Sequence, residues 1–377
     1  MTHPAAVALG VGFRVLAESS TSSAALVVPD CPVGECSDPQ AVSAFAAGCD
    51  VMTFDHEHVP QALLQSLEGA GTVVRPGSRA LLHAQDKLRM RSELTAAGIA
   101  CPRWRAVRDL AELEEFGREV GLPVVLKTPR GGYDGRGVVF VNKADEARDR
   151  FDRLRAEVRD RSGHADALLA EEMIEFDREL AVLVARSPSG QAAAWPVVQT
   201  VQADGMCSEV VAPAPDLPVA LAGQATRTAL RLAAHLDVVG VLAVEMFQVT
   251  GPDGARSVLV NELAMRPHNS GHWTIDGAVT SQFEQHLRAV LDLPLGSTRA
   301  RAPWTVMVNV VGGDRPDLYR SYLHVMARDP GVKVHLYGKE VRPGRKIGHV
   351  TVCGEDLRDC RDRARHAADF ITGVIDS

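Results

Sequence analysis

Two glutamates lie inside apolar, strand-like runs, where burial would normally exclude charge. Glu245 is in GVLAVEMFQV and Glu262 is in SVLVNELAMRPHNSGHW, and a Gly-Pro-Asp-Gly turn sequence separates the runs. This pattern predicts an antiparallel hairpin in which the two carboxylates point into one site. Two like charges so close need a cation, and Mg²⁺ fits because proteins typically hold it with one or two carboxylates plus substrate phosphates. Arg266, four residues after Glu262, would face the same pocket.

A glycine-rich loop joins two further predicted strands. The strand Pro123–Thr128 carries Lys127 near its end, the strand Gly137–Val141 follows, and PRGGYDGR lies between them. This is not a Walker A loop, because the lysine precedes the glycines and no strand–loop–helix arrangement follows. Glycines let backbone N–H groups approach phosphates closely, and Lys127 adds a point charge. Combined with the distant glutamate pair, the loop favours phosphate binding.

Other polar residues have two interpretations each. Glu171 and Glu172 end the predicted strand Ala167–Ile174, either as surface charges or as a hinge whose backbone meets an adenine. In the second interpretation Glu179 accepts hydrogen bonds from ribose hydroxyls. Glu57, in the sequence Asp-His-Glu-His, is either a polar strand end or a ligand contact; alternation places the acids and the histidines on opposite faces, which argues against one shared metal.

A basic loop near the end of the chain also has two interpretations. It reads YGKEVRPGRK, and a solvated loop is the default for such a run. In a net-acidic protein, however, Lys339, Arg345 and Lys346 could form a phosphate cradle. His268 and His272 follow the second glutamate in a polar loop, where an isolated histidine is usually a hydrogen-bonding surface residue.

The elements that must position these residues begin with a parallel-sheet pattern. Strand-like runs at Phe13–Ala17, Asp50–Phe54 and Thr72–Val74 alternate with helical segments, which predicts a parallel sheet of the dinucleotide-fold type. The chain starts with a helix over Thr2–Leu9, whereas such a domain normally starts with a strand and a glycine-rich turn. One helix is predicted from Ser78 through Ala97, with Lys87 on a solvated face.

Composition restricts the class of protein. The 377 residues are enough for two or three domains, and the net charge of -7 argues against a general nucleic-acid binder. Seven cysteines without a CxxC pair favour a reducing compartment and neither a disulfide framework nor a zinc site. No apolar run approaches the length of a membrane span and no signal peptide is evident. We therefore expect a cytoplasmic protein that binds neither membranes nor nucleic acid.

Four motifs together carry a family resemblance. The chain resembles the ATP-grasp carboxylate–amine ligases and, within them, the N5-carboxyaminoimidazole ribonucleotide synthase family, over nearly its whole length. The resemblance implies an α/β, ATP-grasp fold with a Rossmann-like domain over residues 1–100, a small lid domain over 101–170 and a C-terminal domain over 171–377 with the metal site and the substrate loop. It also implies a homodimer that uses ATP and Mg²⁺. The motifs are GGYDGRG (Gly131–Gly137), NELAMRPHNSGHWT (Asn261–Thr274), SQFEQHLRAVLDLPL (Ser281–Leu295) and KEVRPGRKIGH (Lys339–His349).

The resemblance assigns roles residue by residue. The metal ligands are Glu245 and Glu262, and the residues implied to line the chemistry are Arg266, Lys127, Asp134, His268 and Asn269. The implied substrate contacts are Glu57, Tyr133, Asp134, Arg136, Lys339, Arg345 and Lys346. The implied ATP contacts are Lys87, Lys127, Gly132, Tyr133, Asp134, Gly135, Arg136, Gly137, Val138, Glu171, Glu172, Met173, Ile174, Glu179, Gln202, Asn261 and Glu262.

The reaction implied is the ATP- and bicarbonate-dependent carboxylation of 5-aminoimidazole ribonucleotide, through carboxyphosphate, in purine biosynthesis. Two alternatives remain: a sister ligase such as the formate-using phosphoribosylglycinamide transformylase, and a nucleotide-binding homologue without catalysis. Ala264 stands where the wider superfamily often has asparagine, so two carboxylates must suffice. Met265 replaces the family's usual proline.

The family pattern also bears on the N-terminus. Members begin with a hydrophobic strand and a turn such as Gly-Gly-Gly-Gln-Leu before the helix that here starts at Met1. We therefore expect Met1 to be an internal methionine of the natural protein. Missing ladder partners cost roughly 1–3 kcal/mol per buried backbone group, so this form should melt lower and bind the ribonucleotide more weakly than an extended one.

Overall fold

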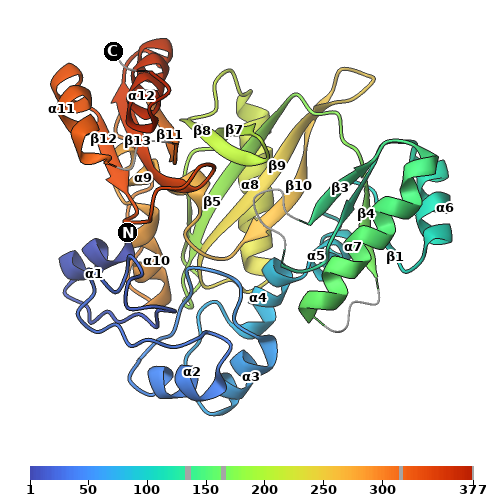
Figure 1. Cartoon of the computed structure of the whole chain (residues 1–377), viewed down its shortest axis with the longest axis horizontal. Coiled ribbons are helices and arrows are strands. Elements are labelled where there is room, and N and C mark those ends of the chain that lie inside the picture. The colour runs from blue at the N-terminus through green and yellow to red at the C-terminus, as the bar shows by residue number, and fades with distance from the viewer. Residues whose placement is uncertain (132–136, 163–166, 314–316, 376–377) are drawn as a thin grey trace.

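The computed structural model describes residues 1–131, 137–162, 167–313 and 317–375 (Figure 1). Side chains are described in these ranges except at positions 159–162. Figure 1 shows three groups of elements: the N-terminal helices, a small sheet with its own helices, and a large central sheet that continues into the C-terminal helices. No helix among the described residues is long and apolar enough to cross a membrane.

The N-terminal region contains five helices and two isolated β-bridges. The bridges are parallel, as predicted, and join Ala17 to Val33 and Met52 to Val74. The expected continuous ladder is absent from the described residues, because the segments around Ala17 and Met52 do not pair with each other and each has a single bridged neighbour. The helices are α1 (Thr2–Leu9), α2 (Pro39–Ala46), α3 (Gln61–Gly69), α4 (Ser78–Gln85) and α5 (Lys87–Ala96).

The prediction of one helix from Ser78 to Ala97 is wrong, because the chain breaks at Asp86. Its extended backbone (φ -132°, ψ 107°) ends α4, and its side chain accepts hydrogen bonds from Leu88 N and Arg89 N to cap α5. An aspartate competes with the helix backbone in this way and so favours caps over helix interiors. The break makes Lys87 the first residue of α5.

A four-stranded antiparallel sheet follows, in the order β1-β4-β2-β3. Two helices cover it, and their apolar residues, such as Phe116 and Phe151, pack with the inward residues of the strands into one core. Asp109 precedes helix α6 as its N-cap, and its side chain accepts a hydrogen bond from Glu112 N. The elements are β1 (Trp104–Val107), α6 (Leu110–Val120), β2 (Val124–Lys127), β3 (Val138–Val141), η1 (Ala144–Glu146), α7 (Ala147–Ser162) and β4 (Leu168–Glu172).

The large sheet has nine strands, in the order β10-β9-β5-β7-β8-β11-β13-β12, with β6 pairing to β5. Its described pairs are antiparallel. The predicted strand Ala192–Val201 divides in two around Pro196. The strands are β5 (Arg178–Arg186), β6 (Ala192–Ala194), β7 (Val198–Ala203), β8 (Met206–Ala212), β9 (Gly240–Thr250), β10 (Arg256–Ala264), β11 (Trp304–Val311), β12 (Lys333–Leu336) and β13 (Lys346–Gly354).

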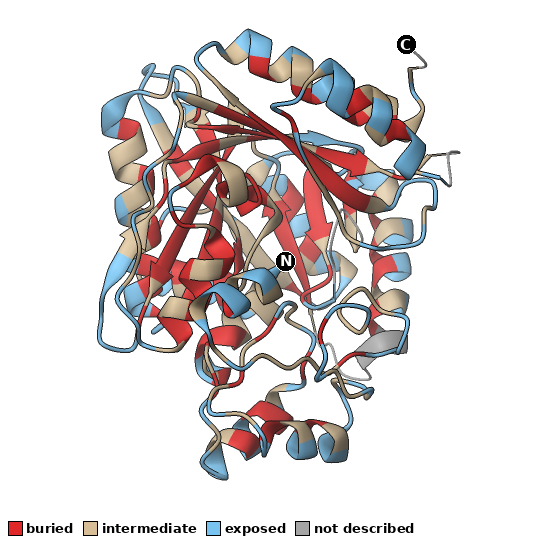
Figure 2. Cartoon of the chain, turned by 90° about the vertical axis from the view of Figure 1, so that its left-hand side faces the viewer, coloured by how far each residue is buried: buried red, intermediate tan, exposed pale blue. Residues whose placement is uncertain are grey.

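Both faces of the large sheet are buried, as the alternation along β5 illustrates. Leu180, Val182 and Val184 belong to the core under α8, whereas Ala181 and Leu183 belong to the core with Trp273 on the opposite face. Figure 2 shows burial concentrated on the strands, while the helices keep exposed outer faces. The covering elements are α8 (Val219–His235), η2 (Asn269–Gly271), α9 (Thr274–Gly277), α10 (Gln282–Val290), α11 (Tyr319–Arg328) and α12 (Leu357–Thr372).

Candidate active site

The two glutamates predicted to share a site are direct cross-strand partners. Strands β9 and β10 form the predicted hairpin, and Glu262 pairs in register with Glu245. A β-bulge at Asn261 makes this possible. Glu262 lies two positions after the buried Val260, so in a regular strand it would face the apolar core. The extra residue of the bulge moves it to the opposite face, where Glu245 lies.

The electrostatics of this pair favour a cation. Burial, followed by the charges of Glu262 and Glu179, raises the pKa of Glu245 to about 8, although Lys346 and Lys87 act in the opposite direction. No group of three or more His, Cys, Asp or Glu side chains that could hold a metal occurs among the described residues. Two carboxylates without further protein ligands suit Mg²⁺, which typically keeps several waters and binds substrate phosphates.

Two lysines approach this region from different elements. Lys87 Nζ, at the start of α5, lies 2.5 Å from Glu262 Oε1, and its backbone N–H donates to Pro129 O at the start of the glycine-rich loop. Burial alone would lower the pKa of Lys87, but the charge of Glu262 raises it. Lys127 Nζ, at the end of β2, lies 2.5 Å from Glu171 Oε2. Both predicted phosphate-binding lysines therefore lie beside carboxylates of this region.

Glu171 is the centre of a buried ion-pair cluster that also contains Arg91. Glu171 is 2% exposed and Arg91 is fully buried. Burial opposes ionisation of Glu171, yet Lys127 and Arg91 lower its pKa to about 2. Sequence reasoning missed Arg91. The available signal was its position four residues after Lys87, which places both side chains on one face of α5.

The predicted adenine hinge and ribose contact adjoin this cluster. Glu172 pairs with Arg103 through two hydrogen bonds of 2.7 and 3.1 Å, and Met173 is exposed. Burial raises the pKa of Glu179, while a hydrogen bond with the side chain of Gln202 lowers it. The structure thus brings Glu179 and Gln202 together, and their role as nucleotide contacts stays a prediction. Ile174 follows β4 in the same connecting segment.

An aromatic pair beside this segment was not predicted. Phe176 stacks on Phe247 with ring centroids 4.7 Å apart and an interplanar angle of 16°. Phe247 lies directly opposite Glu179 in the sheet and two residues after Glu245 on β9. Its alternation with Glu245 is the sequence signal that could have placed it on the site's face of the strand.

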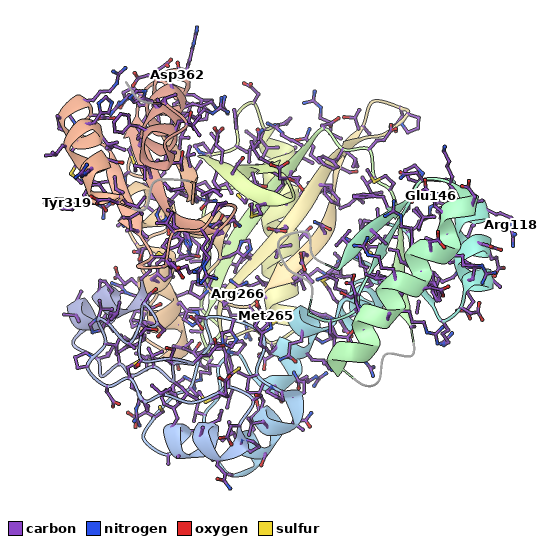
Figure 3. The ribbon with its side chains drawn as sticks, viewed as in Figure 1. Arg118, Glu146, Met265, Arg266, Tyr319 and Asp362 are labelled. Carbon is purple, nitrogen blue, oxygen red and sulfur yellow. The ribbon has the colours of Figure 1, made fainter. Side chains whose placement is uncertain are left out.

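Arg266, His268 and Asn269 follow β10 and lie at its end. Figure 3 labels Arg266 near the centre of the molecule, where the lower ends of the large sheet's strands approach the N-terminal region. Its Nε donates to Glu57 Oε2 at 2.7 Å, so Glu57 is connected to this region by its ion pair with Arg266. Burial, and then the charge of Arg266, lowers the pKa of His268 to about 3, so this histidine is neutral. Its Nε2 lies 3.6 Å from Glu245 Oε1.

Asn269 belongs to a second buried polar group. Its side-chain amide exchanges hydrogen bonds of 3.0 and 2.8 Å with Asn309 on β11. Asn309 also donates to the carbonyl of Cys207 on β8. These bonds fix the amide of Asn269 relative to the sheet, and Asn309 is a residue that sequence reasoning did not identify.

The predicted phosphate cradle is only partly assembled at the glutamates. Lys346 begins β13, and its charge acts on Glu245. Lys339 is exposed and its Nζ lies over the ring of Tyr337, 5.5 Å from the centroid. Arg345 is also exposed and donates to Glu340 O at 3.4 Å. The loop therefore extends from the glutamate pair outward to solvent.

The centre of the glycine-rich loop lies outside the described residues, so the predicted contacts at Gly132, Tyr133, Asp134, Gly135 and Arg136 stay predictions. The described end of the loop closes as a hairpin. Thr128 N donates to Gly137 O, and Val138 pairs with Lys127 in the sheet. Gly137 has φ +71°, and a Cβ there would lie 2.4 Å from Thr128 Oγ1, so the position requires glycine.

Comparison with known proteins places this geometry in a family. The model of the ATP-grasp domain matches residues 92–283, that of the phosphoribosylaminoimidazole carboxylase C-terminal domain matches 305–363, and that of the ribonucleotide synthetase preATP-grasp domain matches 1–85. The chain is 54% identical over 375 residues to the N5-carboxyaminoimidazole ribonucleotide synthase of Mycobacterium bovis, covering 99% of this chain and 85% of the relative.

Two solved structures agree with the sequence relatives. N5-carboxyaminoimidazole ribonucleotide synthetase from Thermus thermophilus superposes with a TM-score of 0.85 at 37% identity, covering 100% of this chain and 96% of that one. The Aspergillus clavatus enzyme in complex with ADP and 5-aminoimidazole ribonucleotide gives a TM-score of 0.85 at 31% identity, with 98% and 95% coverage. The expected ATP-grasp fold is confirmed, and the chain belongs to the N5-carboxyaminoimidazole ribonucleotide synthase family.

Proposed function

We propose that this protein is an ATP-dependent ligase that carboxylates 5-aminoimidazole ribonucleotide to N5-carboxyaminoimidazole ribonucleotide, with bicarbonate as the carbon source. The activity is that of the named relatives, and the ligands of the Aspergillus clavatus structure, ADP and the ribonucleotide, are the expected product and substrate. The observation that carries the proposal is the register pairing of Glu245 with Glu262 beside two lysines.

The chain's own residues account for nucleotide binding and orientation. We assign phosphate binding to Lys127 and Lys87. Each lysine is ion-paired with a carboxylate, which an incoming phosphate can replace as the partner of the ammonium group. When Mg²⁺ is held by Glu245 and Glu262, it neutralises charge on the transferring phosphoryl group. The aromatic pair of Phe176 and Phe247 supplies an apolar surface beside the ribose contact Glu179.

The chemistry then proceeds in two steps. An oxygen of bicarbonate attacks the γ-phosphorus, the bond to the bridging oxygen of ADP breaks, and carboxyphosphate forms. The amine nitrogen of the ribonucleotide next attacks the carboxyl carbon, inorganic phosphate leaves, and the nitrogen loses a proton. Arg266 supplies a fixed positive charge for the anionic intermediate, and neutral His268 supplies a hydrogen-bonding ring. Exclusion of water protects carboxyphosphate from hydrolysis.

The remaining features of the proposal concern organisation. We assign residues 1–100, 101–170 and 171–377 to three domains; the four-stranded sheet, whose strands run from Trp104 to Glu172, supports the middle assignment. Lys339, Arg345 and Lys346 bind the ribonucleotide phosphate. The active protein is a cytoplasmic homodimer, and sedimentation at several concentrations tests its stoichiometry.

The test is release of ADP from ATP with each substrate omitted in turn. The full mixture of Mg²⁺, bicarbonate and aminoimidazole ribonucleotide should give rapid release, and omission of the ribonucleotide should slow it. Replacing bicarbonate and the ribonucleotide by formate and glycinamide ribonucleotide tests the sister-ligase alternative. Turnover with that pair only would overturn the assignment, and ADP binding without turnover in any mixture would favour the non-catalytic alternative.

A further inference from the structure

We propose that Arg91 is a positioning residue that aims Glu262 at the metal and Lys127 at the nucleotide. Arg91 is fully buried, yet its guanidinium has partners on two other elements. Its Nε is ion-paired with Glu171 on β4. Its two terminal nitrogens donate to backbone carbonyls on β10, at Val260 O (3.2 Å) and Asn261 O (2.7 Å).

The two carbonyls identify what Arg91 holds. They belong to the residues at the β-bulge, which is the feature that turns Glu262 from the apolar core to the face of Glu245. A bulge disrupts the ladder locally and leaves its extra residue without a ladder partner. Arg91 supplies donors at that place, so it stabilises the backbone conformation on which the direction of Glu262 depends.

Helix α5 therefore contacts β10 at two successive residues. Lys87 and Arg91 lie one turn apart on the same face of α5; the first reaches the Glu262 carboxylate and the second reaches the backbone preceding it. The same guanidinium orients Glu171, whose Oε2 forms an ion pair with Lys127 Nζ at 2.5 Å. Arg91 thus connects the metal pair and a phosphate lysine without facing the ligand itself.

Lysine cannot replace arginine at this position. An ammonium group is a compact point charge, whereas the planar guanidinium presents five donors in a fixed fork and can serve a carboxylate and two carbonyls at once. R91K keeps the buried positive charge beside Glu171 but loses at least one carbonyl contact. Loss of an outer-shell contact typically weakens metal affinity or activity by about 10–100-fold.

The inference rests on the proposed function, because it needs Glu262 to bind Mg²⁺. The experiment measures binding as well as turnover: calorimetric titration of ADP at a series of Mg²⁺ concentrations, and Mn²⁺ binding followed by electron paramagnetic resonance. For R91K we expect the Mg²⁺ concentration needed for tight ADP binding to rise about tenfold or more. The KM for aminoimidazole ribonucleotide should stay at the parent value, and kcat should fall.

Two variants separate positioning from general damage. R361K makes the same change at Glu209, a carboxylate that is 3% exposed and lies under α12, and it should leave the Mg²⁺ requirement unchanged. E171Q removes the carboxylate partner of Arg91 but leaves both carbonyl contacts, so it should raise the KM for ATP with little change in the Mg²⁺ requirement. If R91K does not fold, E171Q still tests the inference, because a rise of about tenfold over the parent in its own Mg²⁺ requirement would overturn it.

The outcomes are distinct. An unchanged Mg²⁺ requirement in folded R91K overturns the inference, as does an equal rise in R361K. A rise in E171Q as large as in R91K also overturns it, because the effect would then come from the ion pair and not from the bulge. If the parent protein itself shows no Mg²⁺-dependent turnover, the proposed function fails first, and the binding titrations still report on Arg91.

Discussion

Two buried carboxylates in this molecule are paired with cations in different ways. Glu171 is 2% exposed and Glu209 is 3% exposed, and each is ion-paired with two basic side chains. At Glu209 both cations come from one helix: Arg361 and Arg365 lie one turn apart on α12, at 2.8 and 2.7 Å. This pairing joins one helix to the sheet.

At Glu171 the two cations come from separate elements. Arg91 belongs to α5 and Lys127 to β2, and Arg91 continues to the backbone of β10. The pairing therefore joins the N-terminal region, the small sheet and the glutamate hairpin at one point. Similar burial and similar partners thus have different consequences, because what matters is how many separate segments of the chain meet at the charge.

The largest expected effect is on turnover, and it comes from the glutamate pair, to which Arg91 connects Glu171. Glu262→Gln removes a charge with little change in volume, so the protein should fold. Its Mg²⁺-dependent ADP release should fall by at least about a hundredfold, the scale of losing one group that stabilises transition-state charge. Glu245→Gln should act in the same direction but less severely.

Steady-state ADP release provides the measurement, with Glu209→Gln as the matched control. Glu209→Gln removes the same charge from a more deeply buried position outside the site and should keep parent turnover. Parent turnover in both metal-pair variants would show that the hairpin carboxylates are not the metal ligands.

The second effect compares the two buried carboxylates directly, through the free energy of unfolding. Glu171→Gln leaves Arg91 buried and unpaired, and breaking a buried pair costs about 3–5 kcal/mol. Glu209→Gln leaves arginines whose side chains are 28% and 53% exposed and can rehydrate, so about 1–3 kcal/mol should be lost. Denaturant unfolding of both variants checks the difference, and equal losses would remove the distinction between the two carboxylates.

The third effect concerns exposed cations, in contrast to the half-buried Lys127 and the buried Arg91. Lys339→Ala or Arg345→Ala should weaken aminoimidazole ribonucleotide binding by about ten- to a hundredfold, as expected for loss of one charge-assisted hydrogen bond. ATP affinity and the free energy of unfolding should hardly change, because both side chains are exposed. Binding titrations with each ligand decide the matter; equal weakening of ATP would place this loop at the nucleotide.

The smallest effect is on acid stability. The pKa of Glu171 is lowered from 4.5 to about 2 in the folded protein, so its ionised form contributes stability above pH 4.5. That contribution is lost as the pH falls from 4.5 toward 2, because the unfolded state then binds the proton more readily. Glu171→Gln should flatten this part of the stability profile, measured by denaturant unfolding across the acid range. An unchanged slope would mean that other carboxylates dominate it.

The site could be predicted from the sequence where chemistry coincided with strand periodicity. Glu245 and Glu262 interrupt apolar runs on either side of a turn sequence, and their register pairing confirms the hairpin. The bulge at Asn261 has no such signal, because residue spacing within one strand does not show how that strand pairs with its neighbour. Simple alternation along β10 would place Glu262 on the face of the buried Val260, and only the bulge brings it to the face of Glu245.

The errors and omissions arose where side-chain capping or tertiary contacts determine the structure. The helix predicted across Asp86 breaks there because a capping aspartate can replace a backbone hydrogen bond. Arg91 looked like one more basic residue on a charged helix, and only the approach of β10 and β4 buries it. The predicted parallel strands of the first hundred residues form single bridges because ladder formation depends on which segments become neighbours.

The central claim is that bicarbonate is activated by phosphoryl transfer before the amine attacks. Single turnover with ¹⁸O-labelled bicarbonate, unlabelled ATP and aminoimidazole ribonucleotide tests it most directly. Carboxyphosphate formation requires one bicarbonate oxygen to remain on phosphorus, so the inorganic phosphate released with the carboxylated product should carry one ¹⁸O atom. Phosphate free of ¹⁸O, formed in step with that product, would contradict the account.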